Sequence, residues 1–426
     1  MHPDHVDVLV VGGGPAGSIA ALVLARAGAS VAVVDKARFP RDKACGDLVG
    51  PRGLQVLADL GVEEPAGIDL GDMVVIGPSG RRVLLPSADG ITYPGRARAV
   101  TRTVFDDRLR QAALDAGARP VEGRAAAPLG PDGDLRGFAV EAVGGATRRL
   151  TADFVLGADG ATSHVARVAG LVDGARVLWG FAVRSYIEQP VDLPVITLWD
   201  QRRWRAFPGY GWIFPGPDGM ANVGLGVGTL ADRSAGALAV QALPGFLRRL
   251  GQLGLLSPGA DAPTPRLGGW LKMGMVGTTP ARGRVLLAGD AAGLVNPLQG
   301  EGIAQAMTSG RAAARAIVER PSGAAAAYRR HLAHDHLPYQ RVTAAGHAAL
   351  VGRPRAVSVV GRVVTSPLVG RGLAGGWGVF WNELLQGAAP GTARRVAAGA
   401  TVAGRALTAR TEVTRWFDAT YGGTGS

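Results

Sequence analysis

Cysteine is almost absent from this chain of 426 residues, because Cys45 is its only one. A single thiol excludes an intramolecular disulfide framework and a zinc site built from several thiolates. Lysine is also scarce, with only Lys36, Lys43 and Lys272 among 46 basic residues. No run reaches the roughly 18 uncharged apolar residues that a membrane span needs. The apolar start, residues 6–24, lacks the basic flank of a secretory signal, so the sequence predicts a cytoplasmic protein.

The composition is that of a folded protein with an uneven distribution of charge. Hydrophobic residues make up 47% of the chain and charged residues 19%, which excludes a disordered chain. Residues 311–426 hold 15 arginines and five acidic residues, so ten of the twelve net positive charges lie there. We interpret this basic C-terminal region as a solvated helical surface or as a peripheral contact with an anionic membrane surface. We expect no nucleic-acid partner.

The clearest motif follows a buried apolar run and precedes a helical pattern, as in a βαβ unit that binds a dinucleotide. Glycines at the spacing G-x-G-x-x-G allow a tight turn, close approach of the backbone to a pyrophosphate, and packing of helix on strand. The N-terminus of the helix favours an anion, and an acid ending the next strand can accept ribose hydroxyl hydrogens. The expected cofactor-binding residues here are Gly12, Gly14, Pro15, Ala16, Gly17, Asp35 and Lys36.

Two later segments place an acid directly after a short apolar strand, where it can hold a ribose or ribityl hydroxyl. The strands are expected at residues 154–157 and 285–288. A glycine turn then leads into a helix and can direct N–H groups toward a ring carbonyl. A second match to the glycine pattern, residues 370–375, has no strand before it and is interpreted as a loop. The cofactor-binding residues expected in the later segments are Asp159, Gly289, Asp290, Gly300, Gly302 and Ile303.

The order of these patterns predicts an α/β fold of two interleaved lobes and a tail. A Rossmann-like lobe is expected from residues 1–75, 101–175 and 276–320. An antiparallel, β-rich substrate lobe is expected from residues 76–100 and 176–275. Residues 321–426 form the basic helical region, including an amphipathic pattern at residues 396–407. Helices are expected in the two lobes at residues 15–27, 51–60, 103–117, 161–169 and 302–318.

Aromatic residues gather in one short segment, since six of the 24 fall within residues 199–214. Alternation puts Tyr210, Trp212 and Phe214 on one face of a strand. This face fits either an aromatic sheet core or the wall of a cavity for an apolar ligand.

Histidines gather once, in a segment that also holds an acid. Helical spacing does not bring all of these side chains to one face, and nothing else supplies ligands. We therefore expect no metal site. The residues concerned are His331, His334, Asp335 and His336.

Together, these motifs resemble the flavoproteins that share the para-hydroxybenzoate hydroxylase fold, whose FAD-binding lobe is like that of glutathione reductase. The resemblance implies that the first glycines bind the FAD pyrophosphate and Asp35 the adenosine ribose. It matches Asp159 to a mid-chain Asp-Gly motif and Asp290 to a late Gly-Asp motif on the ribityl chain. Arg102 matches an arginine that usually lies near the flavin.

Two further segments narrow the resemblance to geranylgeranyl reductases. Residues 39–47 are similar to the loop that these enzymes place over the isoalloxazine ring, including its single cysteine. Residues 210–215 and 223–226 resemble their Y-x-W-x-F-P…G substrate signature. The resemblance covers about residues 6–320, with Asp35 in place of the commoner glutamate and Ala44 where proline is frequent. It adds Arg41, Cys45 and Gly46 to the cofactor site and implies that Tyr210, Trp212, Phe214, Pro215 and Gly224 bind substrate.

The resemblance implies a FAD-dependent oxidoreductase that reduces C=C bonds of an isoprenoid or other lipophilic substrate by hydride transfer from FADH₂. Because no second convincing dinucleotide motif is present, NAD(P)H or a ferredoxin-type donor would bind transiently. Cys45 would be catalytic, by shaping the site or assisting protonation, and an inert packed thiol is its alternative. The alternative functions are a FAD-dependent monooxygenase acting on an apolar metabolite and a non-redox isoprenoid cyclase. A flavin-dependent halogenase is less favoured, because residues 210–215 match its W-x-W-x-I-P motif only loosely.

Overall fold

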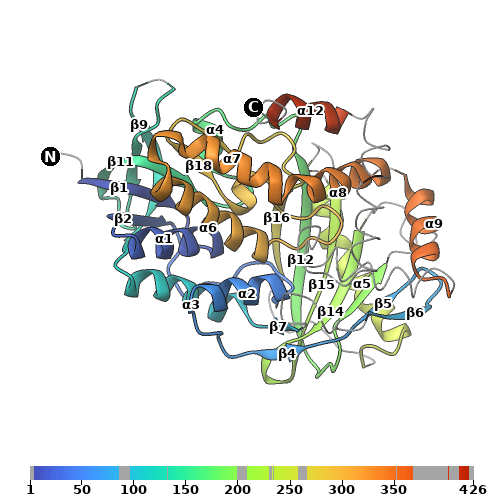
Figure 1. Cartoon of the computed structure of the whole chain (residues 1–426). Coiled ribbons are helices and arrows are strands. Elements are labelled where there is room, and N and C mark those ends of the chain that lie inside the picture. Colours follow the sequence, from blue (N-terminus) through green and yellow to red (C-terminus); the bar gives the residue numbers. More distant parts are fainter. Residues whose placement is uncertain are drawn as a thin grey trace.

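Two large β-sheets lie side by side, with helices that cover the first sheet and continue toward the second (Figure 1). The computed structural model describes residues 4–85, 96–131, 133–198, 209–229, 233, 235–257, 266–351, 353–367, 402 and 412–421. The expectations for residues 370–375 and, apart from the single residue 402, for residues 396–407 fall outside the described residues.

In the part of the chain that the structure describes, the first sheet has eight strands and a parallel centre in the order β18-β11-β1-β2-β8. Its central strand β1 is short, apolar and buried toward its carboxyl end, as expected for a strand covered on both faces. Antiparallel strands flank this centre, because β17 pairs with β18 and the β9–β10 hairpin extends β11. The strands are β1 (Asp4–Val11), β2 (Val31–Asp35), β8 (Arg119–Glu122), β9 (Arg124–Leu129), β10 (Gly137–Glu141), β11 (Thr147–Gly157), β17 (Ala281–Arg282) and β18 (Val285–Leu287).

Helices of the first lobe pack on this sheet and on one another. α1 contacts both α3 and α6, and α2 packs against α6. Pro15 lies in the first turn of α1, where its missing N–H costs no hydrogen bond. The helices are α1 (Pro15–Arg26), α2 (Pro51–Asp59), α3 (Arg102–Asp115), α4 (His164–Val168) and α6 (Ile303–Glu319).

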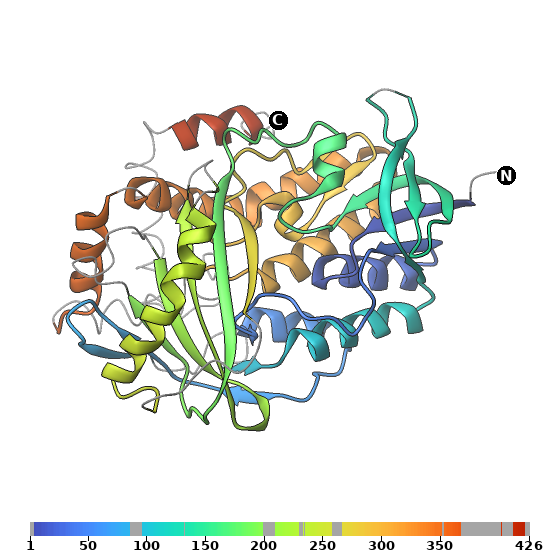
Figure 2. The same cartoon turned by 180° about the vertical axis from the view of Figure 1, so that it is seen from behind.

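The second sheet has seven described strands in the order β16-β12-β15-β14-β13-β5-β6 and is antiparallel except where β13 meets β5. Helix α5 (Ala235–Gln252) packs on one of its faces, which Figure 2 shows from behind. The opposite face carries a second apolar cluster that includes Trp212 and Phe214. The strands are β5 (Met73–Ile76), β6 (Arg82–Leu85), β12 (Leu178–Glu188), β13 (Val195–Leu198), β14 (Gly209–Pro215), β15 (Met220–Thr229) and β16 (Leu267–Met273).

The remaining described elements are a small third sheet, three short 3-10 turns and the helices of the C-terminal part. A small sheet in the order β3-β7-β4 begins directly after residues 39–47, which we call the cysteine loop. Helix α8 continues from α7, and α9 stands at the far end of the second sheet (Figure 1). These elements are β3 (Leu48–Val49), β4 (Ile68–Leu70), β7 (Ala97–Ala99), the 3-10 turns η1 (Pro217–Gly219), η2 (Gly289–Ala292) and η3 (Pro321–Gly323), and helices α7 (Ala324–Asp335), α8 (Leu337–Leu350), α9 (Pro354–Val364) and α12 (Glu412–Tyr421).

The predicted fold class is confirmed: a Rossmann-like lobe, an interleaved antiparallel lobe and a helical C-terminal part. Two details differ. The helix expected at residues 161–169 is only His164–Val168, because Ser163 caps its N-terminus by accepting a hydrogen bond from the Ala166 N–H. Helix α5 lies within a segment expected to be mainly β, and its apolar face is buried against β12 and β15.

Candidate active site

The glycine turn between β1 and α1 is too tight for any side chain at two of its positions. Gly12 has φ +105°, and a Cβ there would lie 2.2 Å from the carbonyl oxygen of Ala158. A Cβ on Gly17 would lie 1.8 Å from the carbonyl oxygen of Gly12. Among the described residues no side chain caps α1, so its first N–H groups remain available to an anion.

Three acids surround this turn, each after a parallel strand. Asp35 accepts hydrogen bonds from the Gly13 N–H (2.7 Å) and the Ala37 N–H (2.8 Å), which fixes its carboxylate beside the turn. Asp159 caps α4 through Oδ2, while its Oδ1 is buried without a hydrogen-bond partner. Asp290 lies 3.5 Å from Nζ of Lys43, which connects the late motif to the cysteine loop.

A buried cluster of two arginines and one acid lies beside the glycine turn. Asp106 is fully buried and accepts two hydrogen bonds from Arg102, at 2.7 and 2.8 Å. Its Oδ2 also lies 3.0 Å from Nη1 of Arg41. A Cβ on Gly14 would lie 3.3 Å from Nη2 of Arg41, so this guanidinium faces the turn. The cluster carries one net positive charge.

These features fit FAD. An uncapped helix N-terminus and the net charge of the arginine cluster suit a pyrophosphate, and carboxylates at strand ends suit hydroxyl groups. The Gly12–Gly17 turn would hold the pyrophosphate, Asp35 the adenosine ribose, and Asp290 the ribityl chain. Lys36 is exposed at the end of β2 and has no hydrogen-bond or ion-pair partner among the described residues.

The cysteine loop packs directly on the aromatic strand β14. A Cβ on Gly46 would lie 2.9 Å from the ring of Phe214, which shows how closely the two segments approach. Burial raises the pKa of the Cys45 thiol and outweighs the opposing effect of Arg102. Cys45 is therefore a neutral thiol near pH 7 that retains its proton.

A polar network beneath this loop fixes its conformation. Asn222 donates to the Cys45 carbonyl oxygen and to Asp47, both at 2.9 Å, and accepts from the Trp212 indole at 2.9 Å. Asp47 also accepts a hydrogen bond from the Tyr186 hydroxyl. Its φ of +61° is in the left-handed region that non-glycine residues seldom adopt. The hydrogen bonds to Asn222 and Tyr186 therefore fix the cysteine loop at Asp47, the residue with the unusual backbone conformation.

Asp47 makes stability depend on pH. Burial raises its pKa from 3.8 to about 6, although Tyr186 and Arg184 act in the opposite direction. The native protein therefore holds this proton more tightly than the unfolded chain, so the contribution of Asp47 to stability falls as the pH rises from about 4 to 6. Asparagine accepts the same two hydrogen bonds and tolerates this backbone region.

We expect the free energy of unfolding of Asp47→Asn, measured with urea, to rise relative to that of the unchanged protein as the pH increases from 4 to 7. The expected change in this difference is up to about 3 kcal/mol. Asp107→Asn is the control, because Asp107 is partly exposed and makes no hydrogen bond or ion pair among the described residues. If the difference in unfolding free energy between Asp47→Asn and the unchanged protein stays constant with pH, the raised pKa of the buried Asp47 carboxyl is contradicted.

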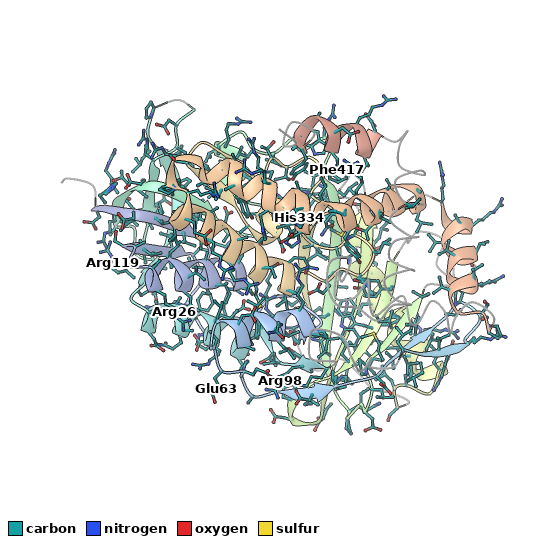
Figure 3. All side chains as sticks on the ribbon, in the orientation of Figure 1. Arg26, Glu63, Arg98, Arg119, His334 and Phe417 are labelled. Atoms are coloured by element: carbon teal, nitrogen blue, oxygen red, sulfur yellow. The ribbon has the colours of Figure 1, made fainter. Side chains whose placement is uncertain are left out.

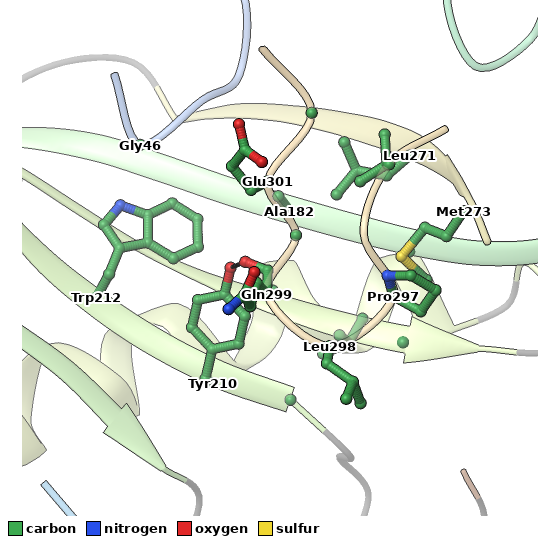
Figure 4. A pocket seen from close by; sticks show the side chains of 18 of the residues that line it. Gly46, Ala182, Tyr210, Trp212, Leu271, Met273, Pro297, Leu298, Gln299 and Glu301 are labelled. Carbon is green, nitrogen blue, oxygen red and sulfur yellow. Dashed lines mark hydrogen bonds between the residues drawn. The ribbon is translucent and has the colours of Figure 1, made fainter. Parts of the chain in front are cut away.

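One cavity of ≈ 420 Å³ joins the two halves of the site. Tyr210, Trp212 and Phe214 line one wall, which confirms their expected common strand face. Tyr210 donates a hydrogen bond to the carbonyl oxygen of Gln299, as Figure 4 shows, so the aromatic strand touches the glycine turn before α6. The other predicted residues on its lining are Pro15, Cys45, Gly46, Arg102, Asp290, Gly300, Gly302 and Ile303.

Two residues predicted to bind substrate, Pro215 and Gly224, are not among the residues that line the cavity. Pro215 ends β14. Gly224 lies behind the indole of Trp212, because a Cβ there would be 2.3 Å from that ring. Gly224 therefore makes room for the aromatic wall and does not itself line the cavity.

The sequence reasoning missed Lys272, whose side chain is fully buried on β16. Its Nζ donates a hydrogen bond of 2.7 Å to the Ala291 carbonyl oxygen in η2, next to Asp290. Burial lowers the pKa of this amine to about 8. Lys272 thus connects the second sheet to the turn that carries the late Gly-Asp motif.

It also missed the contributions of Asp106, Asn222, Gln299 and Glu301. Gln299 and Glu301 flank the predicted Gly300 and Asp106 follows Arg102 by one helical turn, but only the folded structure shows what these side chains contact. Glu301 lines the cavity and caps α6 through the Ala304 N–H at 3.1 Å.

The histidine segment lies on α7 and at its end, away from the cavity lining. His331 and His334 each contact the carboxylate of Asp335, and Figure 3 shows His334 among the side chains of α7. Within the described ranges no group of three or more histidine, cysteine or acidic side chains could hold a metal ion. None of the helices described is long and apolar enough to cross a bilayer.

Comparisons with known proteins agree with this geometry. A family model described as an FAD binding domain matches residues 5–185. The menaquinone reductase of Mycolicibacterium smegmatis is 39% identical over 318 residues, covering 73% of this chain and 76% of that protein. Digeranylgeranylglycerophospholipid reductase 2 of Methanopyrus kandleri is 33% identical over 320 residues, covering 74% and 77%.

The fold is also found among solved structures. A geranylgeranyl bacteriochlorophyll reductase-like protein from Thermoplasma acidophilum has a TM-score of 0.71 at 21% identity, covering 98% of this chain and all of that one. The predicted FAD dependence and the predicted enzyme class are confirmed. With a glycine turn for a dinucleotide, an apolar cavity beside it and relatives above 30% identity, this chain belongs to the geranylgeranyl reductase family of FAD-dependent oxidoreductases.

Proposed function

We propose that this protein reduces C=C bonds in the isoprenoid chain of a lipid. The observation that carries the proposal is the cavity, which begins at the expected flavin site and continues between apolar walls. Near Arg102, Cys45 and Gly300 the lining is partly polar. Beyond them it is formed by aliphatic and aromatic side chains, including Ile196, Leu198, Phe181, Leu271, Met273, Val357 and Val364. An unbranched polar substrate would gain little from such walls, whereas an isoprenoid chain buries apolar surface on all sides.

Bound flavin would supply the hydride, and the chain's own residues would control orientation and protons. The aromatic wall of Tyr210, Trp212 and Phe214 would position the apolar chain and exclude water. Reduction of a C=C bond also requires one proton. The neutral Cys45 thiol carries a proton at the cavity wall, and Glu301 lies on the same lining. We propose Cys45 as the group that shapes this end of the site or assists protonation.

The relatives' names support a lipid with an isoprenoid part. One is called a menaquinone reductase and the other a digeranylgeranylglycerophospholipid reductase. We therefore propose prenylquinones and prenylated polar lipids as the first substrate classes to be tested. As electron donor we propose transiently bound NAD(P)H or a ferredoxin-type protein.

The test uses purified flavin-loaded protein, reduced anaerobically with dithionite and mixed with prenyl diphosphates, prenylquinones or prenylated polar lipids. We expect a product heavier by one hydrogen pair for each bond reduced, read by mass spectrometry. NADPH, NADH or reduced ferredoxin then replaces dithionite to identify the donor.

A second half of each mixture is exposed to air. If the anaerobic half gives no product and the half exposed to air gives a product with one added oxygen atom, the reductase proposal is overturned and the monooxygenase alternative is established. An isomer of unchanged mass would instead indicate a cyclase. Cys45→Ala and Cys45→Ser follow on the active substrate, and turnover unchanged in both would remove Cys45 from the proposed chemistry.

A further inference from the structure

The cavity opens at α9, the helix at the far end of the second sheet. Val357, Val360, Gly361 and Val364 line the cavity and recur at helical spacing, so one face of α9 forms its wall. Val360 is also 44% exposed, and Leu298, another lining residue, is 40% exposed. Side chains that line a cavity and also face solvent lie at its mouth.

A second apolar stripe on α9 points away from the cavity. Val359 is 60% exposed and Val363 is 48% exposed, and these valines lie one helical turn apart. Neither of them lines the cavity. The apolar arc of α9 is therefore wider than its role as a cavity wall requires.

Arginines border this outer stripe. Arg353, Arg355 and Arg362 are exposed, and none of them has an ion-pair partner in the part of the chain that the structure describes. The helix carries no acidic residue. A helix with an apolar stripe beside unpaired cations is typical of one that lies in the headgroup region of an anionic bilayer.

We propose that α9 docks on the surface of an anionic lipid bilayer and that the lipid substrate passes from the bilayer into the cavity through the mouth between Val360 and Leu298. The inference rests on the proposed lipid substrate and adds the route by which it arrives. Val359 and Val363 would enter the headgroup–acyl boundary, while Arg355 and Arg362 would contact lipid phosphates. The isoprenoid chain would then move from one apolar environment to another without crossing water.

A protein partner fits the stripe less well. Two valines and their neighbours give a small apolar area, far below that of a stable protein interface. Binding to a bilayer needs only a few inserted apolar side chains, because several cations add to the affinity. The excess of arginine over acidic residues in residues 311–426 favours the same anionic surface.

The direct test is sedimentation of the flavin-loaded protein with phosphatidylglycerol vesicles and with phosphatidylcholine vesicles. We expect binding to the anionic vesicles that weakens with salt. Removing two surface arginines with Arg355→Ala/Arg362→Ala should weaken it roughly 30-fold, at about 1 kcal/mol for each. Val359→Asp/Val363→Asp should weaken it at least about tenfold, because charge replaces the inserted side chains.

Matched controls lie on the first lobe, at the opposite end of the molecule from α9 in Figures 1 and 2. Arg119→Ala/Arg149→Ala removes the same charge from exposed arginines without described ion-pair partners, and Figure 3 shows the position of Arg119. Val143→Asp replaces a valine that is 84% exposed near the β10–β11 turn. We expect both control proteins to bind vesicles nearly as well as the unchanged protein.

Equal binding by the α9 variants and their controls would overturn the proposal. Binding to phosphatidylcholine vesicles as tight as to phosphatidylglycerol vesicles would also overturn it, as would no binding to either kind of vesicle. These outcomes are independent of turnover, so they are distinct from a failure of the proposed reaction. Once a substrate is identified, Val359→Asp/Val363→Asp should lose turnover with substrate embedded in vesicles and keep it with substrate dispersed in detergent. An equal loss in both assays would show damage to the cavity and would also count against docking.

Discussion

Gly17→Ala should purify with little or no flavin. The added Cβ would lie 1.8 Å from the Gly12 carbonyl oxygen, which is a backbone atom, so no flexible side chain can move aside to relieve the clash. The turn must open, which moves the first N–H groups of α1 away from the pyrophosphate position. We expect the dissociation constant for FAD to rise at least about 100-fold, equivalent to about 2.7 kcal/mol. Flavin absorbance per protein and titration of the apoprotein with FAD would measure this.

The same turn supplies the control. A Cβ on Gly13 would meet its nearest atom, Oδ2 of Asp35, at 3.4 Å, which is an ordinary contact. Gly13→Ala should therefore retain flavin with an affinity within about threefold of the unchanged protein, well under 1 kcal/mol. Equal loss of flavin in both variants would show that the turn does not tolerate any side chain and that the specific clash at Gly17 is not the cause.

Asp106→Ala should be the most destabilising single change beside the flavin site. It leaves Arg102, which is only 4% exposed, as a buried cation without its carboxylate, and removes the ion pair to Arg41. Removing one partner of a buried ion pair typically destabilises a protein by about 3–5 kcal/mol. Urea unfolding of both proteins at saturating FAD would measure the difference.

The control is Asp107→Ala, which removes the same single negative charge from the neighbouring residue. Asp107→Ala should change stability by less than about 1 kcal/mol, because that side chain is partly exposed and makes no ion pair within the described segments. The double variant Asp106→Ala/Arg102→Met should recover part of the loss, since no unpaired cation remains at that position. A double variant less stable than Asp106→Ala would argue against unpaired charge as the cause.

Local motifs were the part of the site that could be predicted from the sequence. The glycines at Gly12, Gly14 and Gly17 act through backbone contacts with near neighbours, so their spacing alone indicates the turn. The alternation of Tyr210, Trp212 and Phe214 likewise predicted one shared face, because strand geometry is periodic. Such signals lie within a few residues of one another.

Contacts between distant segments were not predictable in this way. Asn222 reaches the Cys45 carbonyl across 177 residues of sequence, and Lys272 reaches Ala291 from another lobe. An asparagine or a lysine has no pattern that identifies its partner before the sheets are assembled. The apolar pattern of α9 could be recognised as amphipathic, but its role as the end wall of the cavity depends on how α8 and the second sheet meet.

The strand order of the flavin lobe has a consequence for how the protein is made. Strand β11 lies between β1 and β18, whose first residues are Asp4 and Val285. During synthesis the sheet therefore stays incomplete until β18 has left the ribosome, long after its glycine turn has been translated. The antiparallel lobe emerges before that point, so it is available to fold while the parallel sheet still has an exposed edge. Chaperone protection of that edge and late insertion of FAD are the expected features of this protein's biogenesis.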